Sequence, residues 1–128
     1  MSKLMYNELS DRVLGGVFKV HNKLGPGLLE SAYEGACAIE FHHCGLQVER
    51  QVVYPLYYEG VLAGAYVADM VVEGKIILEL KAVKILTPVM EAQLINYLRL
   101  SGIPVGYLLN FRNERVEWKR RVLSSRVC

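Results

Sequence analysis

The sequence lacks long apolar runs and has few cysteines, and each shortage excludes a class of protein. No apolar run approaches the roughly 18 residues that cross a membrane, and residues 1–10 lack the apolar stretch of a secretory signal. Three cysteines in 128 residues, with no Cys-x-x-Cys pair, argue against a disulfide framework and favour reduced thiols. We therefore expect a soluble, cytoplasmic protein that does not act at a membrane.

Metal-binding sulfur and imidazole groups are also scarce. Cys37, His42, His43 and Cys44 lie close together in the sequence, but their spacing matches no common zinc-binding pattern. A zinc protein is therefore not what this sequence predicts.

An excess of one charge is missing too. The net charge of +2 is too small to indicate a nucleic-acid or membrane partner by itself. The distribution is uneven, because residues 112–128 hold six Lys or Arg, Arg126 among them, against two Glu. Such a basic segment can contact phosphates or can be a solvated edge, and the pattern leaves both readings open.

Apolar residues, by contrast, are abundant. A content of 52% hydrophobic and 22% charged residues is typical of an ordered globular protein. A chain of 128 residues is long enough for one hydrophobic core, so we expect a single domain over residues 1–128.

The spacing of these apolar residues predicts helices at the start of the chain and strands after them. Repeats of three or four residues indicate helices, and Thr87-Pro88 forms a typical helix start. Alternating segments rich in Val and Tyr indicate strands, with tight turns at Glu59-Gly60 and Glu73-Gly74. The predicted helices cover 7–23, 29–43 and 88–101, and the predicted strands 46–58, 65–72, 75–83, 104–111 and 115–123.

This order, ααβββαββ, predicts a fold of the α/β (α+β) class. Three strands joined by tight turns are antiparallel, whereas the passage from 75 to 111 is long enough for a helical crossover between parallel strands. We therefore expect a mixed sheet flanked by helices.

Charged residues interrupt two of the predicted strands. Asp69 lies within YVADMVV, and Glu79 and Lys81 lie within IILELK, where alternation places them on one face. They belong either to a solvated face or to a metal site, because neighbouring carboxylates repel each other unless a cation lies between them. A two-residue hairpin would set Val72 opposite Lys75 and Asp69 opposite Leu78, but the sequence leaves this register open.

Two predicted helices carry polar groups at matching intervals. Glu30, Tyr33 and Glu34 fall on one helix face, although an acid in the first turn is also favoured by the helix dipole. Gln93 and Tyr97, four residues apart, can bind a phosphate, stack on a base or pair with each other.

Taken in order, these residues resemble the GxxExxY proteins, which look like a RecB-like branch of the PD-(D/E)xK nuclease superfamily. The resemblance extends from about residue 14 to 121, and Ala68 stands where the signature has a proline, a position that varies widely. The matching positions are Gly27, Glu30 and Tyr33 for the naming motif, Asp69 for the signature acid, Glu79-Leu80-Lys81 for the acid-x-Lys motif, and Gln93 and Tyr97 for the helical QxxxY motif.

The resemblance implies a restriction-endonuclease-like core and metal-dependent hydrolysis of nucleic acid, with DNA as the first expectation. Lys81 would lie beside the attacking water, and Tyr33, Gln93 and Tyr97 would border the nucleic acid. Mg²⁺ or Mn²⁺ would be held by Glu30, Asp69, Glu79 and the carbonyl of Leu80.

A catalytically silent binding or assembly protein with the same fold is the alternative. The tyrosines at 54, 57 and 58 would then suit a homodimer or a surface for a protein partner.

Overall fold

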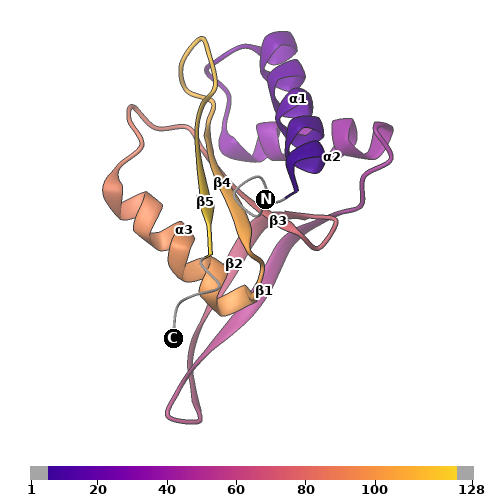
Figure 1. Ribbon diagram of the computed structural model, residues 1–128. Helices are drawn as coiled ribbons and strands as arrows, with labels where there is room; N and C mark the ends of the chain where they lie inside the picture. The colour runs from indigo at the N-terminus through magenta and orange to yellow at the C-terminus, as the bar shows by residue number, and fades with distance from the viewer. Residues whose placement is uncertain (1–5, 124–128) are drawn as a thin grey trace.

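The chain folds in the predicted order of two helices, three strands, one helix and two strands (Figure 1). The computed structural model describes residues 6–123, so Arg126 and Cys128 lie outside the described residues. The helices are α1 (Asn7–Leu24), α2 (Glu30–His43) and α3 (Pro88–Ser101), and the strands are β1 (Val48–Tyr58), β2 (Val61–Val72), β3 (Ile76–Lys81), β4 (Val105–Asn110) and β5 (Glu117–Val122).

The five strands form one mixed sheet in the order β1-β2-β3-β4-β5. Strands β3 and β4 are parallel and are joined through α3, whereas the other neighbouring pairs are antiparallel. The predicted crossover is therefore confirmed. Within residues 6–123, no helix is both long and apolar enough to cross a membrane.

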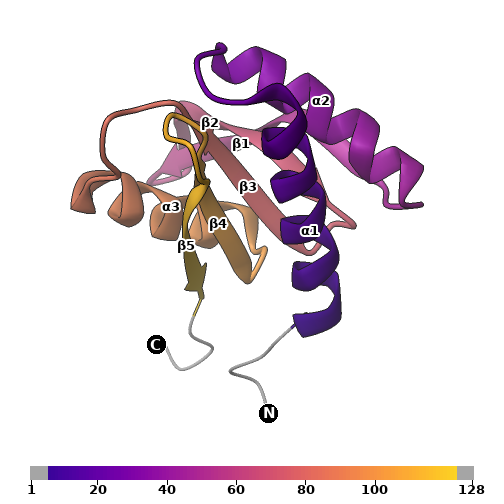
Figure 2. The same cartoon turned by 90° about the horizontal axis from the view of Figure 1, so that it is seen from above.

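Helices cover both faces of this sheet (Figure 2). On one face, Ile76, Leu78 and Leu80 pack with the buried side of α1 and α2. On the other face, Ile77 packs with Leu94 of α3. Strand β3 is thus apolar toward both layers, as expected for a central strand buried on both sides. A charged residue in such a strand has no solvated face to occupy.

The turn between β2 and β3 sets the register of these two strands. Glu73 and Gly74 both have positive φ, and the Lys75 N–H donates to the Val72 carbonyl at 2.9 Å. Lys75 belongs to the turn, however, and Val72 pairs with Ile76. The register that the sequence left open therefore differs by one residue from that of a two-residue hairpin, in which Val72 would pair with Lys75 and Asp69 with Leu78.

The alternation of side chains along β2 shifts by one residue at Asp69. Tyr66 and Ala68 pack in the cluster beneath α3, whereas Met70 and Val72 pack in the cluster beneath α1 and α2. Both neighbours of Asp69 are therefore buried, in opposite layers. On β1, Gln51 lies between positions that pair with the two sides of Asp69 and has φ of 52°, a conformation costly for a residue other than glycine.

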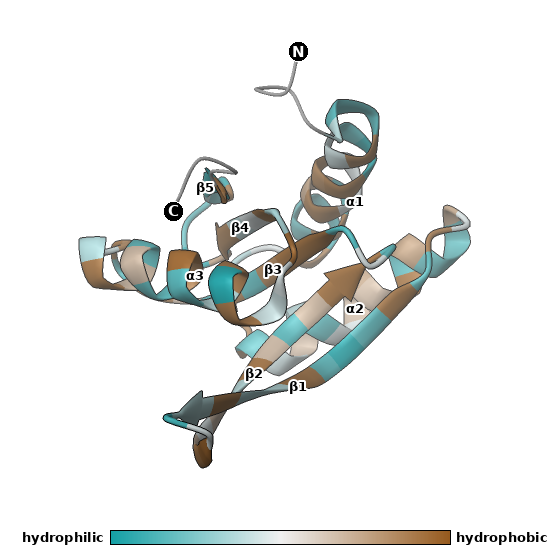
Figure 3. Ribbon diagram, turned by 60° about the horizontal axis from the view of Figure 1, so that its bottom comes forward, coloured by the Kyte–Doolittle hydropathy of each residue, from teal (hydrophilic) through white to brown (hydrophobic). Residues whose placement is uncertain are grey.

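Strands β1 and β2 continue beyond the other strands as a long hairpin. The outer part of this hairpin arm (residues 52–68), from residue 55 to 65, is exposed and projects from the body of the molecule (Figures 1 and 3), whereas Tyr66 and Ala68 near its base are buried. Its tip is the predicted Glu59-Gly60 turn, where both residues have positive φ. The base of the arm borders the irregular position at Asp69, so β2 runs from the arm into this position.

Candidate active site

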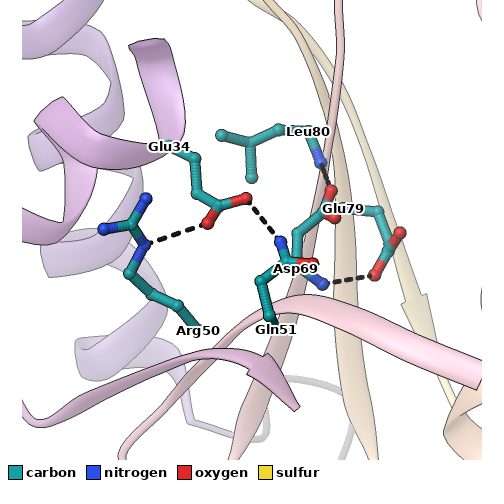
Figure 4. Close-up of polar contacts among 6 residues, drawn as sticks. All are labelled: Glu34, Arg50, Gln51, Asp69, Glu79 and Leu80. Carbon is teal, nitrogen blue, oxygen red and sulfur yellow. Dashed lines mark hydrogen bonds and ion pairs between the residues drawn. The ribbon is translucent and has the colours of Figure 1, made fainter. Parts of the chain in front are cut away.

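At the end of the pairing between β2 and β3, side-chain hydrogen bonds of Asp69 and Glu79 take the place of backbone ladder bonds. The Asp69 N–H donates to Glu79 Oε2 at 3.1 Å, and the Leu80 N–H donates to Asp69 Oδ2 at 2.9 Å (Figure 4). The last ladder pair before this point is Met70 with Leu78, so one further step sets Asp69 across from Glu79. The observed register therefore sets the two acids directly across from each other, whereas a two-residue hairpin would have set Asp69 opposite Leu78.

Each of these carboxylates is held through one oxygen only. Within residues 6–123, no hydrogen bond reaches Asp69 Oδ1 or Glu79 Oε1. In the same part of the chain, no buried side-chain oxygen or nitrogen lacks a partner. The two free oxygens must therefore reach accessible space, where they could bind a cation.

The surroundings of both acids disfavour their charged forms. Burial, with the charge of Asp69 adding to it, raises the pKa of Glu79 to about 7. Burial also raises the pKa of Asp69. The hydrogen bond from the Leu80 N–H opposes this shift, and the charge of Glu34 adds to it. A divalent cation between them would reverse this preference, because an opposite charge nearby favours the ionised form.

Lys81 lies two residues beyond Glu79 and is half-buried. Burial raises the pKa of Asp69 and of Glu79, and the positive charge of Lys81 partly opposes both shifts. No carboxylate in the described part of the chain lies within ion-pair distance of its ammonium group. Lys81 therefore influences both acids without being tied to either of them.

Helix α2 presents two further acids to this region. Glu30 Oε2 accepts a hydrogen bond from the Ala82 N–H at 3.0 Å, directly after β3. Glu34 is 8% exposed and uses both oxygens, which accept bonds of 2.9 Å from Arg50 Nε and Gln51 Nε2 (Figure 4). Glu30 thus keeps one oxygen free, whereas Glu34 does not.

Sequence reasoning placed Glu34 on the correct helix face but gave it no role. Its position four residues after Glu30 was the available signal. Arg50 and Gln51 carry no comparable signal, because an Arg-Gln pair in a strand is ordinary. Their role depends on tertiary packing against α2.

Tyr33 lies in the core and not at the surface. Its side chain is 0% exposed, its ring stacks on Phe111 at 4.5 Å, and its hydroxyl donates to the Gly25 carbonyl at 2.6 Å. The hydroxyl also accepts from the Leu28 N–H at 3.2 Å. The predicted contact of Tyr33 with nucleic acid is therefore wrong, because Tyr33 instead fastens the loop that leads into Glu30.

Tyr97 makes no hydrogen bond with the two carboxylates but stacks on Tyr66, which does. Its ring lies 3.3 Å from the ring of Tyr66 with an angle of 13° between the planes. The Tyr66 hydroxyl donates to Glu79 Oε2 at 2.5 Å. Gln93 is exposed, and its side chain makes no hydrogen bond with Tyr97 or with any other described residue. Tyr66 was missed in the sequence, where only its position three residues before Asp69 could have drawn attention to it.

Asn110 is a further residue that the sequence pattern did not reveal. It is fully buried, and its side chain accepts from the Val83 N–H at 3.0 Å and donates to the Val83 carbonyl at 2.8 Å. It also accepts from the Arg112 N–H at 3.3 Å. Asn110 therefore joins the segment that follows Lys81 to the end of β4.

The basic segment after β4 divides into two parts. Arg120 donates to Ser10 and to Tyr107, and Arg121 pairs with Glu91 of α3. These two residues therefore bind β5 to α1, to β4 and to α3. Arg112 and Arg115 are exposed and remain accessible to a phosphate.

The oxygens around Asp69 suit a hard cation. No group of three or more His, Cys, Asp or Glu residues among residues 6–123 is clustered closely enough to hold a metal ion. Mg²⁺, however, is commonly bound through one or two carboxylates, with waters and substrate phosphates completing its shell. Asp69 and Glu79, each with a free oxygen, fit that pattern. Glu30, with one oxygen free of hydrogen bonds among the described residues, and the carbonyl of Leu80, whose N–H bonds to Asp69, are candidates for further oxygen donors.

A mixed five-stranded sheet between helices, with Asp69, Glu79 and Lys81 where its strands separate, defines a restriction-endonuclease-like fold. The sequence profile of the PD-(D/E)XK nuclease superfamily matches residues 7–121, and the chain belongs to that superfamily.

A similar solved structure supports the same fold. The structure titled "Crystal structure of SSO0001" superposes with a TM-score of 0.52 at 20% sequence identity, covering 73% of this chain and 52% of that one. This chain thus spans about half the length of its structural neighbour, and the likeness concerns the fold alone. The comparison with curated proteins gave no match.

Proposed function

We propose that this protein is a metal-dependent nuclease that hydrolyses phosphodiester bonds in nucleic acid, with DNA as its first candidate substrate. We further propose that it is a GxxExxY protein of the RecB-like branch, with one nuclease domain over residues 1–128. The observation that carries the proposal is the pair of carboxylates, Asp69 and Glu79, each anchored by one oxygen and free at the other. Lys81, two residues after Glu79, forms no ion pair within residues 6–123 and completes the arrangement.

Each residue has a distinct part in the proposed reaction. Mg²⁺ or Mn²⁺, when bound, would stabilise negative charge on the scissile phosphate and raise the reactivity of water. Asp69 and Glu79 would hold the ion, with the Leu80 carbonyl and Glu30 as further ligands. Lys81 would orient the attacking water and balance charge on the phosphate.

A cleavage screen tests this function. Single-stranded, duplex and branched DNA and RNA are incubated with Mg²⁺ or Mn²⁺, with Lys81→Ala beside the wild type. We expect cleavage of at least one substrate, reduced about 10²- to 10⁴-fold in Lys81→Ala, the usual range for a group that assists proton transfer. Lys23→Ala, which removes an exposed lysine of α1, is the matched control and should cut at the wild-type rate.

The contrary outcome is equally clear. If neither ion supports cleavage of any substrate, and neither ion raises the melting temperature, the nuclease proposal fails. The catalytically silent reading would then take its place.

The hairpin arm favours an additional role in assembly. The arm exposes large apolar side chains, each at least 59% accessible: Val53, Tyr57, Tyr58, Val61 and Leu62. Glu59 is the only charged residue in the arm, and no Lys, Arg or His lies between residues 51 and 74. Such a surface offers nothing to a phosphate backbone and suits another uncharged apolar surface. We propose a second copy of this chain as its partner, because a symmetric dimer places the same patch on both sides.

Charge introduced on the arm should separate that dimer. Tyr58→Lys combined with Leu62→Lys should give a monomer by light scattering at a protein concentration where the wild type is a dimer. Ile39→Lys, at an exposed apolar position of α2, should leave the dimer intact. A wild type that is monomeric at high micromolar concentration would show that the arm does not join two copies.

A further inference from the structure

Tyr66 connects helix α3 to the proposed metal-binding carboxylates. It is 7% exposed and lies in β2, three residues before Asp69. Its ring stacks on Tyr97 at 3.3 Å, and Tyr54 of β1 lies 6.0 Å from it in a nearly parallel plane. Of these three hydroxyl groups, only that of Tyr66 hydrogen-bonds to a carboxylate within the described part of the chain.

The contact between Tyr66 and Glu79 decides which way the carboxylate faces. Glu79 Oε2 accepts two hydrogen bonds, from the Tyr66 hydroxyl at 2.5 Å and from the Asp69 N–H at 3.1 Å. Two donors on one oxygen fix the rotation of the group and leave Oε1 as the oxygen that can bind a cation. Without the hydroxyl, one longer bond remains, and the carboxylate can turn about its last torsion, which has only a broad preference.

The ring of Tyr66 is held in turn by Tyr97. Close parallel stacking of two rings restricts the torsions that aim the Tyr66 hydroxyl. The Tyr97 hydroxyl makes no hydrogen bond with any described residue. Tyr97 therefore reaches the carboxylates through its ring and not through its oxygen.

We propose that Tyr66 is a positioning residue for Glu79, and that Tyr97 acts on the site by holding Tyr66 and not by contacting nucleic acid. This inference rests on the proposed nuclease function, since it assigns Glu79 to a metal ion. Groups that orient a metal ligand typically contribute about 10- to 100-fold to metal affinity or activity.

Three conservative variants and one truncation, Tyr97→Ala, test the inference. Mn²⁺ affinity is measured by titration calorimetry in the absence of nucleic acid, and cleavage is then measured across a range of Mg²⁺ concentrations. Tyr66→Phe keeps the ring and should bind Mn²⁺ about 10- to 100-fold more weakly. Its cleavage should recover toward the wild-type rate at high Mg²⁺, whereas a merely structural defect would not respond to metal.

Variants of Tyr97 and Tyr54 distinguish the role of the ring from the role of the hydroxyl. Tyr97→Phe keeps the stack and should match the wild type, whereas Tyr97→Ala should lose metal affinity as Tyr66→Phe does. Tyr54→Phe removes a neighbouring hydroxyl that does not touch Glu79 and serves as the control. Melting temperatures confirm that each variant is folded before metal affinity is compared.

Two results would overturn the inference while leaving the nuclease proposal intact. One is a wild type that binds metal and cuts, together with a Tyr66→Phe variant that does both equally well. The other is a Tyr97→Phe variant with normal metal affinity but poor nucleic-acid binding, which would assign the hydroxyl to the substrate. A wild type that neither binds Mn²⁺ nor cuts any substrate would instead overturn the nuclease function, and this inference with it.

Discussion

Replacing Asp69 by asparagine should abolish metal-dependent cleavage and leave the metal-free protein at least as stable as the wild type. Loss of a charged ligand removes several kcal/mol of charge stabilisation, so we expect cleavage to fall about a thousandfold or more. Stability should move the other way. Burial and the nearby charge of Glu34 raise the pKa of Asp69, so its ionised form is unfavourable in the folded protein. The amide oxygen of asparagine can still accept from the Leu80 N–H.

The measurement pairs cleavage rates in Mg²⁺ with melting temperatures in a chelator near neutral pH. Glu8→Gln removes an exposed acid of α1 and should change neither quantity. An Asp69→Asn protein that is folded and cuts at the wild-type rate would exclude Asp69 as a metal ligand. A large drop in melting temperature would show instead that the charge of Asp69 supports the fold.

Neutralising an acid is expected to lower activity and raise stability when the fold keeps an unfavourable charge because function requires it. Glu79 is 6% exposed and faces Asp69 in a sheet that is apolar on both sides. A purely structural site would replace these acids by apolar residues or supply a cationic partner. Lys81 is near but makes no ion pair with either acid in the described residues. The missing positive charge is what a bound divalent ion would provide.

Much of the fold was predictable because it depends on local pattern. Thr87 does accept a hydrogen bond from the Met90 N–H, and α3 begins at Pro88 as the residue types indicate. The parallel pairing of β3 with β4 followed from the length of the connection. The turns at Glu59-Gly60 and Glu73-Gly74 followed from residues that tolerate positive φ.

The register at the candidate site was not predictable in the same way. Whether Lys75 belongs to the turn or to β3 changes every pairing by one residue, and both choices suit the same residues. The shift of alternation at Asp69 is accompanied by positive φ at Gln51 on the neighbouring strand, for which the sequence carries no signal. Both features arise from packing between elements distant in the sequence, so only the folded chain reveals them.

The first motif of the site also acquires a physical explanation from the structure. Gly27 has φ of 102°, and the Tyr33 hydroxyl bonds to two backbone groups of the same loop. Glu30 begins the helix between them and reaches the Ala82 N–H. Glycine and tyrosine thus shape and fasten a loop, and the glutamate alone extends toward the site. A motif matched by sequence can therefore combine structural and functional residues at adjacent positions.

The second large effect concerns pH and Glu79. Its pKa rises from an ordinary value of 4.5 to about 7, chiefly through burial and then through the charge of Asp69. The folded protein therefore binds this proton more tightly than the unfolded chain does. The stabilisation is complete below about pH 4.5 and disappears as the pH rises to about 7. The loss at this one group is on the order of 3 kcal/mol.

Urea unfolding of the metal-free protein across this pH range, compared with Glu79→Gln, isolates the effect. The glutamine variant cannot ionise, so the difference in unfolding free energy between the two proteins should grow in its favour from pH 4.5 to 7. A difference that does not change with pH would show that Glu79 keeps an ordinary pKa. Comparing the variant with the wild type cancels the contributions of acids far from Glu79, whereas Asp69, whose charge acts on Glu79, contributes to the measured difference together with it.

A divalent ion should reverse this dependence. Binding requires the ionised carboxylate, so Mn²⁺ must displace the proton from Glu79 at any pH below about 7. Mn²⁺ affinity should therefore fall about tenfold for each pH unit below that value, with release of about one proton per ion. Calorimetry in buffers of different ionisation enthalpy measures that proton directly. Metal binding that is independent of pH between 5 and 7 would mean that the ion avoids Glu79, since no exchange of ion for proton would take place at that carboxylate.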